Sequence, residues 1–191
     1  MKILIVGDSF VEGVGAENKY GWAQQFKDSM RDHDTVVSGM GGDNIHKILG
    51  RLQSFSDNFD LVILEVGIND SRYRQSKKGN EVALDKFANA LREFIRFFRA
   101  RNRNAAIIIL GLTRVNERFT NPYKEDKHYL NSHIEKYDAM IGEVCDNEGV
   151  DYVPLPKLLT PEGLLADGIH PSAAGHKLIF QRVSEHVSTK Q

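Results

Sequence analysis

The sequence has 191 residues, of which 25 are Lys or Arg, 26 are Asp or Glu and 41% are hydrophobic, with a formal net charge of −1. This length suits a single domain over residues 1–191, and the hydrophobic content excludes an intrinsically disordered chain. The balanced charge gives no overall attraction to nucleic acid or to an anionic membrane, so neither is expected as a partner.

The chain begins with a short apolar run, residues 3–6, which ends in Gly7 and Asp8. This run is too short for a signal peptide, so we expect a cytoplasmic protein. It is also far shorter than the ~20 residues that a membrane-spanning helix needs, and so is the other long apolar run, residues 105–110. We therefore expect no insertion into a membrane.

Short apolar runs recur along the sequence and predict β-strands. Their near-continuous apolar character indicates burial on both faces, which is typical of a parallel sheet covered by helices. The predicted strands are residues 2–6, 35–38, 61–66, 105–110 and 151–153.

Amphipathic stretches fill the intervals between these strands and predict helices, so the alternation indicates a three-layer α/β sandwich. Ser172 is placed to cap the last helix. Cys145 is the single cysteine and cannot form an internal disulfide, and we expect it to pack in the core from the apolar stripe of its helix. The predicted helices are residues 21–31, 44–52, 81–101, 128–147 and 173–187.

Two longer segments, residues 71–79 and 114–127, are predicted to be irregular. Both are polar or charged, and each could be a solvated loop. In an open parallel sheet, however, ligands bind outside the carboxyl ends of the strands, where both segments begin. They could therefore also wall a pocket.

A serine, an aspartate and a histidine suggest hydrolytic chemistry. Ser9 follows the first predicted strand, and Asp167 and His170 lie three residues apart before the last helix. A serine hydroxyl becomes a good nucleophile when a base takes its proton, and the base works best when a carboxylate orients it. Asp8 and Ser9 could instead cap a turn, and the Asp–His pair could belong to an ordinary loop.

Two further strand ends offer donors for an oxyanion. Gly42 lets a backbone N–H approach a substrate without a Cβ in the way, and the carboxamide of Asn69 can donate from a fixed position. Each also has a structural interpretation, because Gly41 and Gly42 could form the turn before a helix and Asn69 could form an Asx turn. A nucleophile, an Asp–His pair that could act as its base, and two oxyanion donors all lie at strand ends or in flanking loops. Such a combination would rarely arise by chance.

Four sequence blocks make the chain similar to the SGNH hydrolases, the GDSL-type esterase and lipase family. The resemblance extends from Lys2 to about Val187. Phe10 replaces the leucine of the family's nickname, and Ser38 stands near where many members have asparagine, but neither change affects a reacting group. The blocks are G-D-S-F at 7–10, residues 39–44, G-I-N-D at 67–70 and D-G-I-H at 167–170.

The resemblance implies a flavodoxin-like α/β/α sandwich with a five-stranded parallel sheet. It also implies Ser9 as the nucleophile, His170 as the general acid and base, and Asp167 as its orienter. The oxyanion hole would consist of the backbone N–H groups of Ser9 and Gly42 and the side chain of Asn69, and members of the family need no metal.

Two other kinds of site are disfavoured. A phosphate or flavin module could use the glycine-containing turn after the first strand, but the dinucleotide pattern needs a glycine where Asn18 stands, so we expect no cofactor. For a metal, His128 and His133 would face different sides of a helix, and His170 and His176 lack an obvious third partner. We therefore expect no metal either.

The expected partner is a small-molecule ester. The basic irregular segments favour a short, acetyl-type acyl group on a polar, anionic or carbohydrate-like alcohol, because lining a long acyl groove with cations would bury charge. We expect residues 10–15 and 114–127 to border the pocket, and Arg114 and Arg118 to bind the alcohol. The alternative is a lysophospholipase or an acyl-thioesterase that acts on longer acyl chains.

Overall fold

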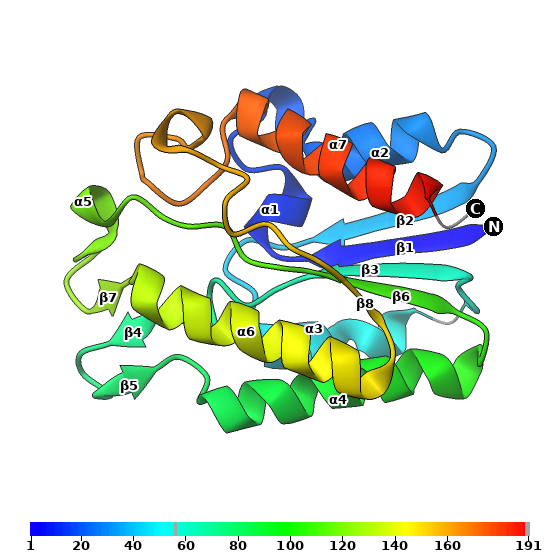
Figure 1. Ribbon diagram of the computed structural model, residues 1–191, viewed down its shortest axis with the longest axis horizontal. Helices are drawn as coiled ribbons and strands as arrows, with labels where there is room; N and C mark the ends of the chain where they lie inside the picture. Colours follow the sequence, from blue (N-terminus) through cyan, green and yellow to red (C-terminus); the bar gives the residue numbers. More distant parts are fainter. Residues whose placement is uncertain (56, 190–191) are drawn as a thin grey trace.

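The main sheet has five parallel strands in the order β2-β1-β3-β6-β8 (Figure 1). The computed structural model describes residues 1–55 and 57–189. The central strands β1 and β3 are buried almost throughout, which confirms the prediction from their apolar character. The strands are β1 (Lys2–Gly7), β2 (Asp34–Gly39), β3 (Leu61–Glu65), β6 (Ala106–Leu110) and β8 (Asp151–Val153).

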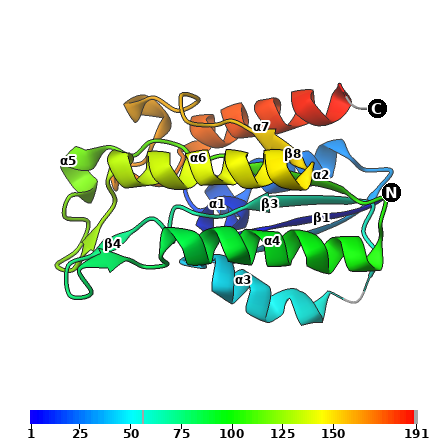
Figure 2. The same cartoon turned by 60° about the horizontal axis from the view of Figure 1, so that its bottom comes forward.

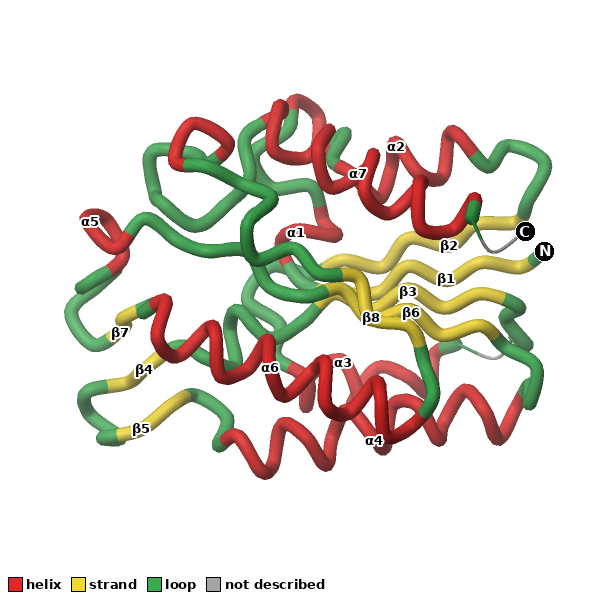
Figure 3. The backbone as a smooth tube through the Cα atoms, viewed as in Figure 1, coloured by secondary structure: helices red, strands yellow, loops and turns green. Residues whose placement is uncertain are grey.

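Helices cover both faces of this sheet, so the predicted flavodoxin-like α/β/α sandwich is confirmed. On one face α2 packs against α7, and on the other α4 lies against both α3 and α6 (Figure 3). Ser172 caps α7 as predicted, and Cys145 is buried in α6. The helices are α2 (Trp22–Ser29), α3 (Ile45–Arg51), α4 (Leu84–Arg101), α6 (Asn131–Glu148) and α7 (Ala173–Ser188).

Shorter helices lie in the connections between these elements. They are α1 (Ser9–Glu12), α5 (Glu117–Thr120), and the 3₁₀ helices η1 (Glu17–Lys19), η2 (Leu52–Ser54) and η3 (Pro161–Gly163).

Across the part of the chain that the structure describes, no helix is both long and apolar enough to cross a membrane.

The helix predicted over residues 81–101 begins only at Leu84. Glu81 is engaged in ion pairs with Arg72 and Arg74, and its backbone N–H bonds the carbonyl of Arg72. These contacts hold the chain extended before the helix. The other predicted helix ends differ from the observed ones by at most three residues.

A second sheet, three-stranded and antiparallel, stands beyond the carboxyl ends of the main strands (Figures 1 and 2). It joins residues 71–79 and 114–127, so the prediction of irregular structure is wrong for parts of both segments. His128 pairs with Tyr73, and the helix predicted from residue 128 therefore begins at Asn131. The strands are β4 (Tyr73–Arg74), β5 (Gly79–Asn80) and β7 (Lys127–His128), in the order β5-β4-β7.

The strand order places a crevice between the carboxyl ends of β1 and β3. From β1 the chain moves to β2 on one side of the sheet and then returns to β3 on the other side. In doubly wound sheets, ligands bind where this progression reverses. The segments that follow β1, β2 and β3 are the ones that carry Ser9, Gly42 and Asn69.

Candidate active site

Ser9 lies in the tight turn between β1 and α1. Asp8 caps α1, because its carboxylate accepts the backbone N–H of Phe10 at 3.0 Å. The helix rests directly on the end of β2, where Gly39 allows the approach: a Cβ at this position would lie 2.1 Å from the backbone nitrogen of Glu12. The capping interpretation is therefore correct for Asp8, whereas Ser9 is the first residue of α1 and lines the cavity at the end of the sheet.

His170 and Asp167 lie beside Ser9, on the loop before α7. The Nε2 atom of His170 is 3.1 Å from Oγ of Ser9, and its Nδ1 atom is 2.5 Å from Oδ2 of Asp167. The other oxygen of Asp167 accepts the backbone N–H groups of Ile169 and His170 at 2.9 and 3.0 Å. When Nδ1 donates to Asp167, Nε2 is left as the acceptor for the hydroxyl proton of Ser9.

Two effects act on the carboxyl group of Asp167 in opposite directions. Partial burial raises its pKa, but hydrogen bonds from the ring of His170 and from the backbone N–H groups of Ile169 and His170 outweigh burial. The pKa of Asp167 therefore lies below its ordinary value. The carboxylate is ionised at neutral pH and can stabilise an imidazolium on His170.

Gly42 and Ser9 line the same cavity at the end of the sheet. Among the described residues, neither of their backbone N–H groups donates to a protein acceptor. Gly42 has a φ of +79°, in the left-handed region that favours glycine, and a Cβ there would meet no atom within 4 Å. The backbone conformation, and not crowding inside the protein, requires glycine at this position.

Asn69 also lines this cavity, and its carboxamide is held at both ends. Its Nδ2 atom donates to Oδ2 of Asp8 at 2.9 Å and to the carbonyl oxygen of Asp43 at 3.0 Å. Its Oδ1 atom accepts the hydroxyl of Tyr129 at 3.3 Å. Both hydrogens on Nδ2 thus face protein acceptors, and a further acceptor in the cavity would have to share one of them.

The cavity has a volume of about 270 Å³. Val14 and Tyr123 come from the two segments that were predicted to border the pocket, and this prediction is confirmed. Arg114 and Arg118, which were expected to bind the alcohol, do not line the cavity, and Arg114 pairs with Glu135 at the surface. The lining residues are Ser9, Val14, Gly41, Gly42, Ile68, Asn69, Arg72, Tyr123, Tyr129, Ile169 and His170.

Three carboxyl groups, those of Asp8, Glu65 and Asp70, are buried at or just after the carboxyl ends of β1 and β3. Burial raises the pKa of Asp8, and it raises the pKa of Glu65 further, with the charge of Asp8 adding to the effect. Glu65 is therefore the member of the pair that keeps its proton to higher pH. Burial likewise raises the pKa of Asp70, to about 7.

Sequence reasoning missed Glu65 and Tyr129. A signal for Glu65 was present, because a carboxyl group in a strand predicted to be buried on both faces needs a special partner. Tyr129 carries no such signal: it reaches the cavity from the end of β7, a two-residue strand that has no periodicity to detect.

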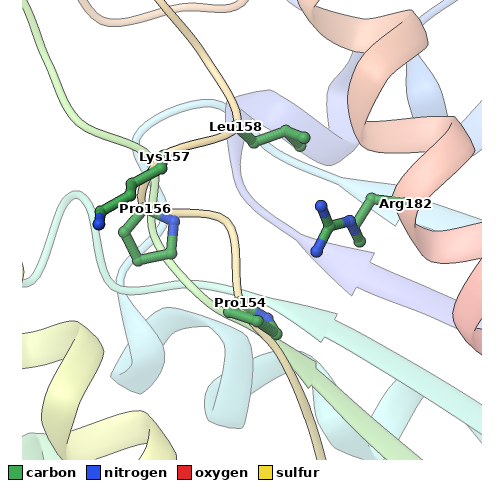
Figure 4. Close-up of a pocket in the computed structure, with 5 residues that line it drawn as sticks. All are labelled: Pro154, Pro156, Lys157, Leu158 and Arg182. Atoms are coloured by element: carbon green, nitrogen blue, oxygen red, sulfur yellow. The ribbon is translucent and has the colours of Figure 1, made fainter.

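A separate cavity of about 400 Å³ lies between α7 and the segment after β8 (Figure 4). Pro154, Pro156 and Leu158 give it apolar walls, and Lys157 and Arg182 add two cations. It has none of the acids, bases or hydroxyl groups that surround Ser9. The cavity at Ser9 is therefore the candidate active site.

The sequence matches the model of the GDSL-like Lipase/Acylhydrolase family over residues 5–178. The esterase TesA of Pseudomonas aeruginosa is 25% identical over 190 residues, covering 95% of this chain and 85% of that protein. An arylesterase of Vibrio mimicus is 24% identical over 195 residues, covering 97% of this chain and 88% of the relative.

Solved structures share the fold. The lipase/acylhydrolase from Enterococcus faecalis superposes with a TM-score of 0.82 at 19% identity, covering 99% of this chain and 96% of that one. Axe2, an acetylxylan esterase from Geobacillus stearothermophilus, gives 0.75 at 18% identity, covering 97% and 93%. Structures of Axe2 catalytic mutants, in which a serine, an aspartate or a histidine is replaced by alanine, are similar as well.

Proposed function

The chain belongs to the GDSL-like lipase/acylhydrolase family and is a carboxylic ester hydrolase, and from this premise we propose that it works through an acyl-enzyme on Ser9. The observation that carries the proposal is the continuous contact from Oγ of Ser9 to His170 at 3.1 Å and from His170 to Asp167 at 2.5 Å, at the wall of one cavity.

The proposed reaction has two halves. Oγ of Ser9 attacks the ester carbonyl carbon while its proton passes to Nε2 of His170. The tetrahedral intermediate then expels the alcohol, which takes this proton from the imidazolium. A water molecule next gives a proton to His170 and attacks the acyl-enzyme, and the carboxylic acid leaves as Ser9 recovers its hydrogen. Asp167 stays ionised throughout and orients the ring.

The proposed oxyanion hole consists of the backbone N–H groups of Ser9 and Gly42 and of Nδ2 of Asn69. The two backbone groups have no protein acceptor among the described residues, so they are available to an oxyanion. Donors held in place before the reaction stabilise the developing charge without reorganisation. Asn69 adds a third donor that is already fixed by Asp8 and Asp43.

We propose short acyl groups on a polar or carbohydrate-like alcohol as substrates. The cavity is small, at about 270 Å³, and its wall combines apolar Val14 and Ile68 with Arg72 and two tyrosines. A long acyl chain would have to pass a half-buried guanidinium, which costs free energy. The similarity in fold to an acetylxylan esterase is consistent with a substrate of this kind.

A fluorophosphonate probe tests Ser9 as the nucleophile, and p-nitrophenyl esters of increasing chain length test the preferred acyl size. Wild-type protein should be labelled on Ser9, and Ser9→Ala should be neither labelled nor active. The value of kcat/KM should be highest for acetyl or butyryl esters. Labelling that persists in Ser9→Ala would refute the nucleophile, whereas labelled Ser9 with highest activity on C10 to C16 esters would refute only the acyl size.

A further inference from the structure

A chain of hydrogen bonds leads from a partly buried cation, Arg72, to Asn69. Nη1 of Arg72 lies 3.2 Å from the hydroxyl of Tyr129, and that hydroxyl lies 3.3 Å from Oδ1 of Asn69. Arg72 is fixed by an ion pair with Glu81 at 2.9 Å. Tyr129 as a whole is only 4% exposed, so its ring has little freedom to move away.

The direction of each hydrogen bond in this chain follows from its donors. A guanidinium group can only donate, so the oxygen of Tyr129 accepts from Arg72 and its hydrogen is left for Oδ1 of Asn69. The carboxamide then has its oxygen toward Tyr129 and its nitrogen toward Asp8 and Asp43, in agreement with the acceptors around Nδ2. Each partner thus requires the same orientation of Asn69.

We propose, on the premise that Asn69 donates to the oxyanion as proposed above, that Tyr129 is a positioning residue that holds and polarises the Asn69 carboxamide, with Arg72 acting through it. Donation to an amide oxygen draws electron density from its nitrogen and strengthens the N–H groups as donors. This matters at Asn69 because its hydrogens are already shared with Asp8 and Asp43, and an oxyanion has to compete with both.

The charge around Tyr129 supports this role. Burial raises the pKa of its phenol, and the nearby positive charge of Arg72 lowers it by less, so the hydroxyl keeps its proton at neutral pH and remains a donor. Glu81 is shared between Arg72, Arg74 and Lys77, and Asp126 also pairs with Arg74, so two carboxylates face three cations. The carboxylates therefore do not fully neutralise these cations, and Arg72 places a positive charge at the end of the hydrogen-bond chain that is farther from Asn69.

The sharpest test removes one hydroxyl group. Tyr129→Phe should lower kcat by about tenfold with KM nearly unchanged, since polarisation of Asn69 matters more in the transition state than in the bound substrate. The matched control is Tyr152→Phe, which also removes one hydrogen-bonded tyrosine hydroxyl: it donates to Asp138 at 2.8 Å, and Tyr152 does not line the cavity. In this control kcat should change by less than about twofold.

Two further readouts separate positioning from a merely structural role. The rate of phosphonylation of Ser9 by a fluorophosphonate should fall with kcat, because the phosphoryl oxygen occupies the oxyanion site. In an Asn69→Ala background, Tyr129→Phe should cause no further loss, because it acts through a group that is then absent. Arg72→Gln should give a smaller fall in kcat that disappears in Tyr129→Phe.

Three results would overturn the inference: an unchanged kcat in Tyr129→Phe, a rise in KM alone, or a loss that multiplies with that of Asn69→Ala. If Tyr129→Phe does not fold, as judged by its thermal transition, the Arg72→Gln series in wild-type and Asn69→Ala backgrounds decides the matter in the same way. Failure of wild-type Ser9 to react with the probe would count against the proposed function itself. A reactive Ser9 together with an unchanged kcat in Tyr129→Phe would refute only this inference.

Discussion

The carboxylate of Asp70 accepts the backbone N–H of Ile45 at 3.0 Å, so the turn after β3 holds the first residue of α3. The other oxygen of this carboxylate is buried, and within the described part of the chain it has no hydrogen-bond partner. The carboxyl group of Asp70 therefore joins the segments that carry Asn69 and Gly42. Its ionised form is poorly solvated, and burial raises its pKa to about 7.

This arrangement predicts that stability falls as pH rises. The folded protein keeps a proton on Asp70 at pH values where the unfolded chain has lost it, so the free energy of unfolding decreases from about pH 4 to pH 7. A shift of this size corresponds to as much as about 4 kcal/mol. Asp70→Asn keeps an acceptor for Ile45 and should flatten the decrease, giving a more stable protein at pH 8.

Urea denaturation of wild type and Asp70→Asn between pH 4 and 8 measures this effect, with the exposed Asp32→Asn as control. The control should follow the wild-type curve. Parallel curves for wild type and Asp70→Asn would show that Asp70 does not hold its proton in the folded state.

The buried side chain of His176 predicts that folding stability also falls when the pH is lowered. It is fully buried, with Nε2 donating to the carbonyl of Val14 at 3.0 Å and Nδ1 accepting the N–H of Trp22 at 3.3 Å, so the ring is neutral. Burial lowers its pKa more than the bond to Val14 raises it. As the pH falls, His176 is protonated in the unfolded chain before it is protonated in the folded protein. Stability is therefore lost as the pH falls below about 6.5.

His176→Gln should therefore be less stable at pH 7 but lose less stability between pH 6.5 and 5 than wild type does. Thermal melting at fixed pH steps measures the two slopes. The exposed His46→Gln serves as the control and should keep the wild-type slope. Equal slopes for wild type and His176→Gln would contradict the assignment of a neutral buried ring.

Ser9 and His170 should behave as one unit in kinetics. Ser9→Ala and His170→Ala should each remove nearly all of the activity, and the double variant should be no worse than either, because neither residue works without the other. Single-turnover and steady-state assays with p-nitrophenyl acetate measure the losses. Losses that multiply in the double variant would show that the two side chains act independently.

Asn69→Ala should lower kcat by about 10² to 10³ with little change in KM, which is the effect of removing one oxyanion donor. Asn80→Ala is a suitable control, because Asn80 bonds the carbonyl of Ser71 outside the cavity. A raised KM with an unchanged kcat would make Asn69 a substrate-binding residue instead.

Gly42→Ala should damage both turnover and stability. The left-handed backbone costs an alanine about 1 kcal/mol, and relaxation of that strain moves the N–H that is proposed to face the oxyanion. Gly50→Ala is the matched control: it lies within α3, is not left-handed, and its added Cβ would also meet nothing within 4 Å. Gly50→Ala should stabilise the helix slightly and leave kcat unchanged. Equal kcat in both variants would exclude Gly42 from the oxyanion hole.

The sequence carries enough information to predict the main sheet, because its buried strands are short apolar runs separated by amphipathic helices. It also brings Ser9, Asp167 and His170 to attention, since their residue types fit one reaction. It does not predict the small sheet, whose strands have two residues each and whose β4–β7 pair joins Tyr73 to His128, 55 residues further along the chain. Tyr129 depends on that pairing, and its contact with Asn69 is therefore visible only in three dimensions.

The direct pairing of β4 with β7 has a consequence for redesigning specificity. Tyr73 lies opposite His128, so Arg72 before β4 and Tyr129 after β7 are held in register by one ladder. A graft of residues 71–80 from a relative would leave β7 without its own partner strand and would shift the tyrosine against the arginine. The two segments are therefore best exchanged together, as a cassette, with the five-stranded sheet left untouched.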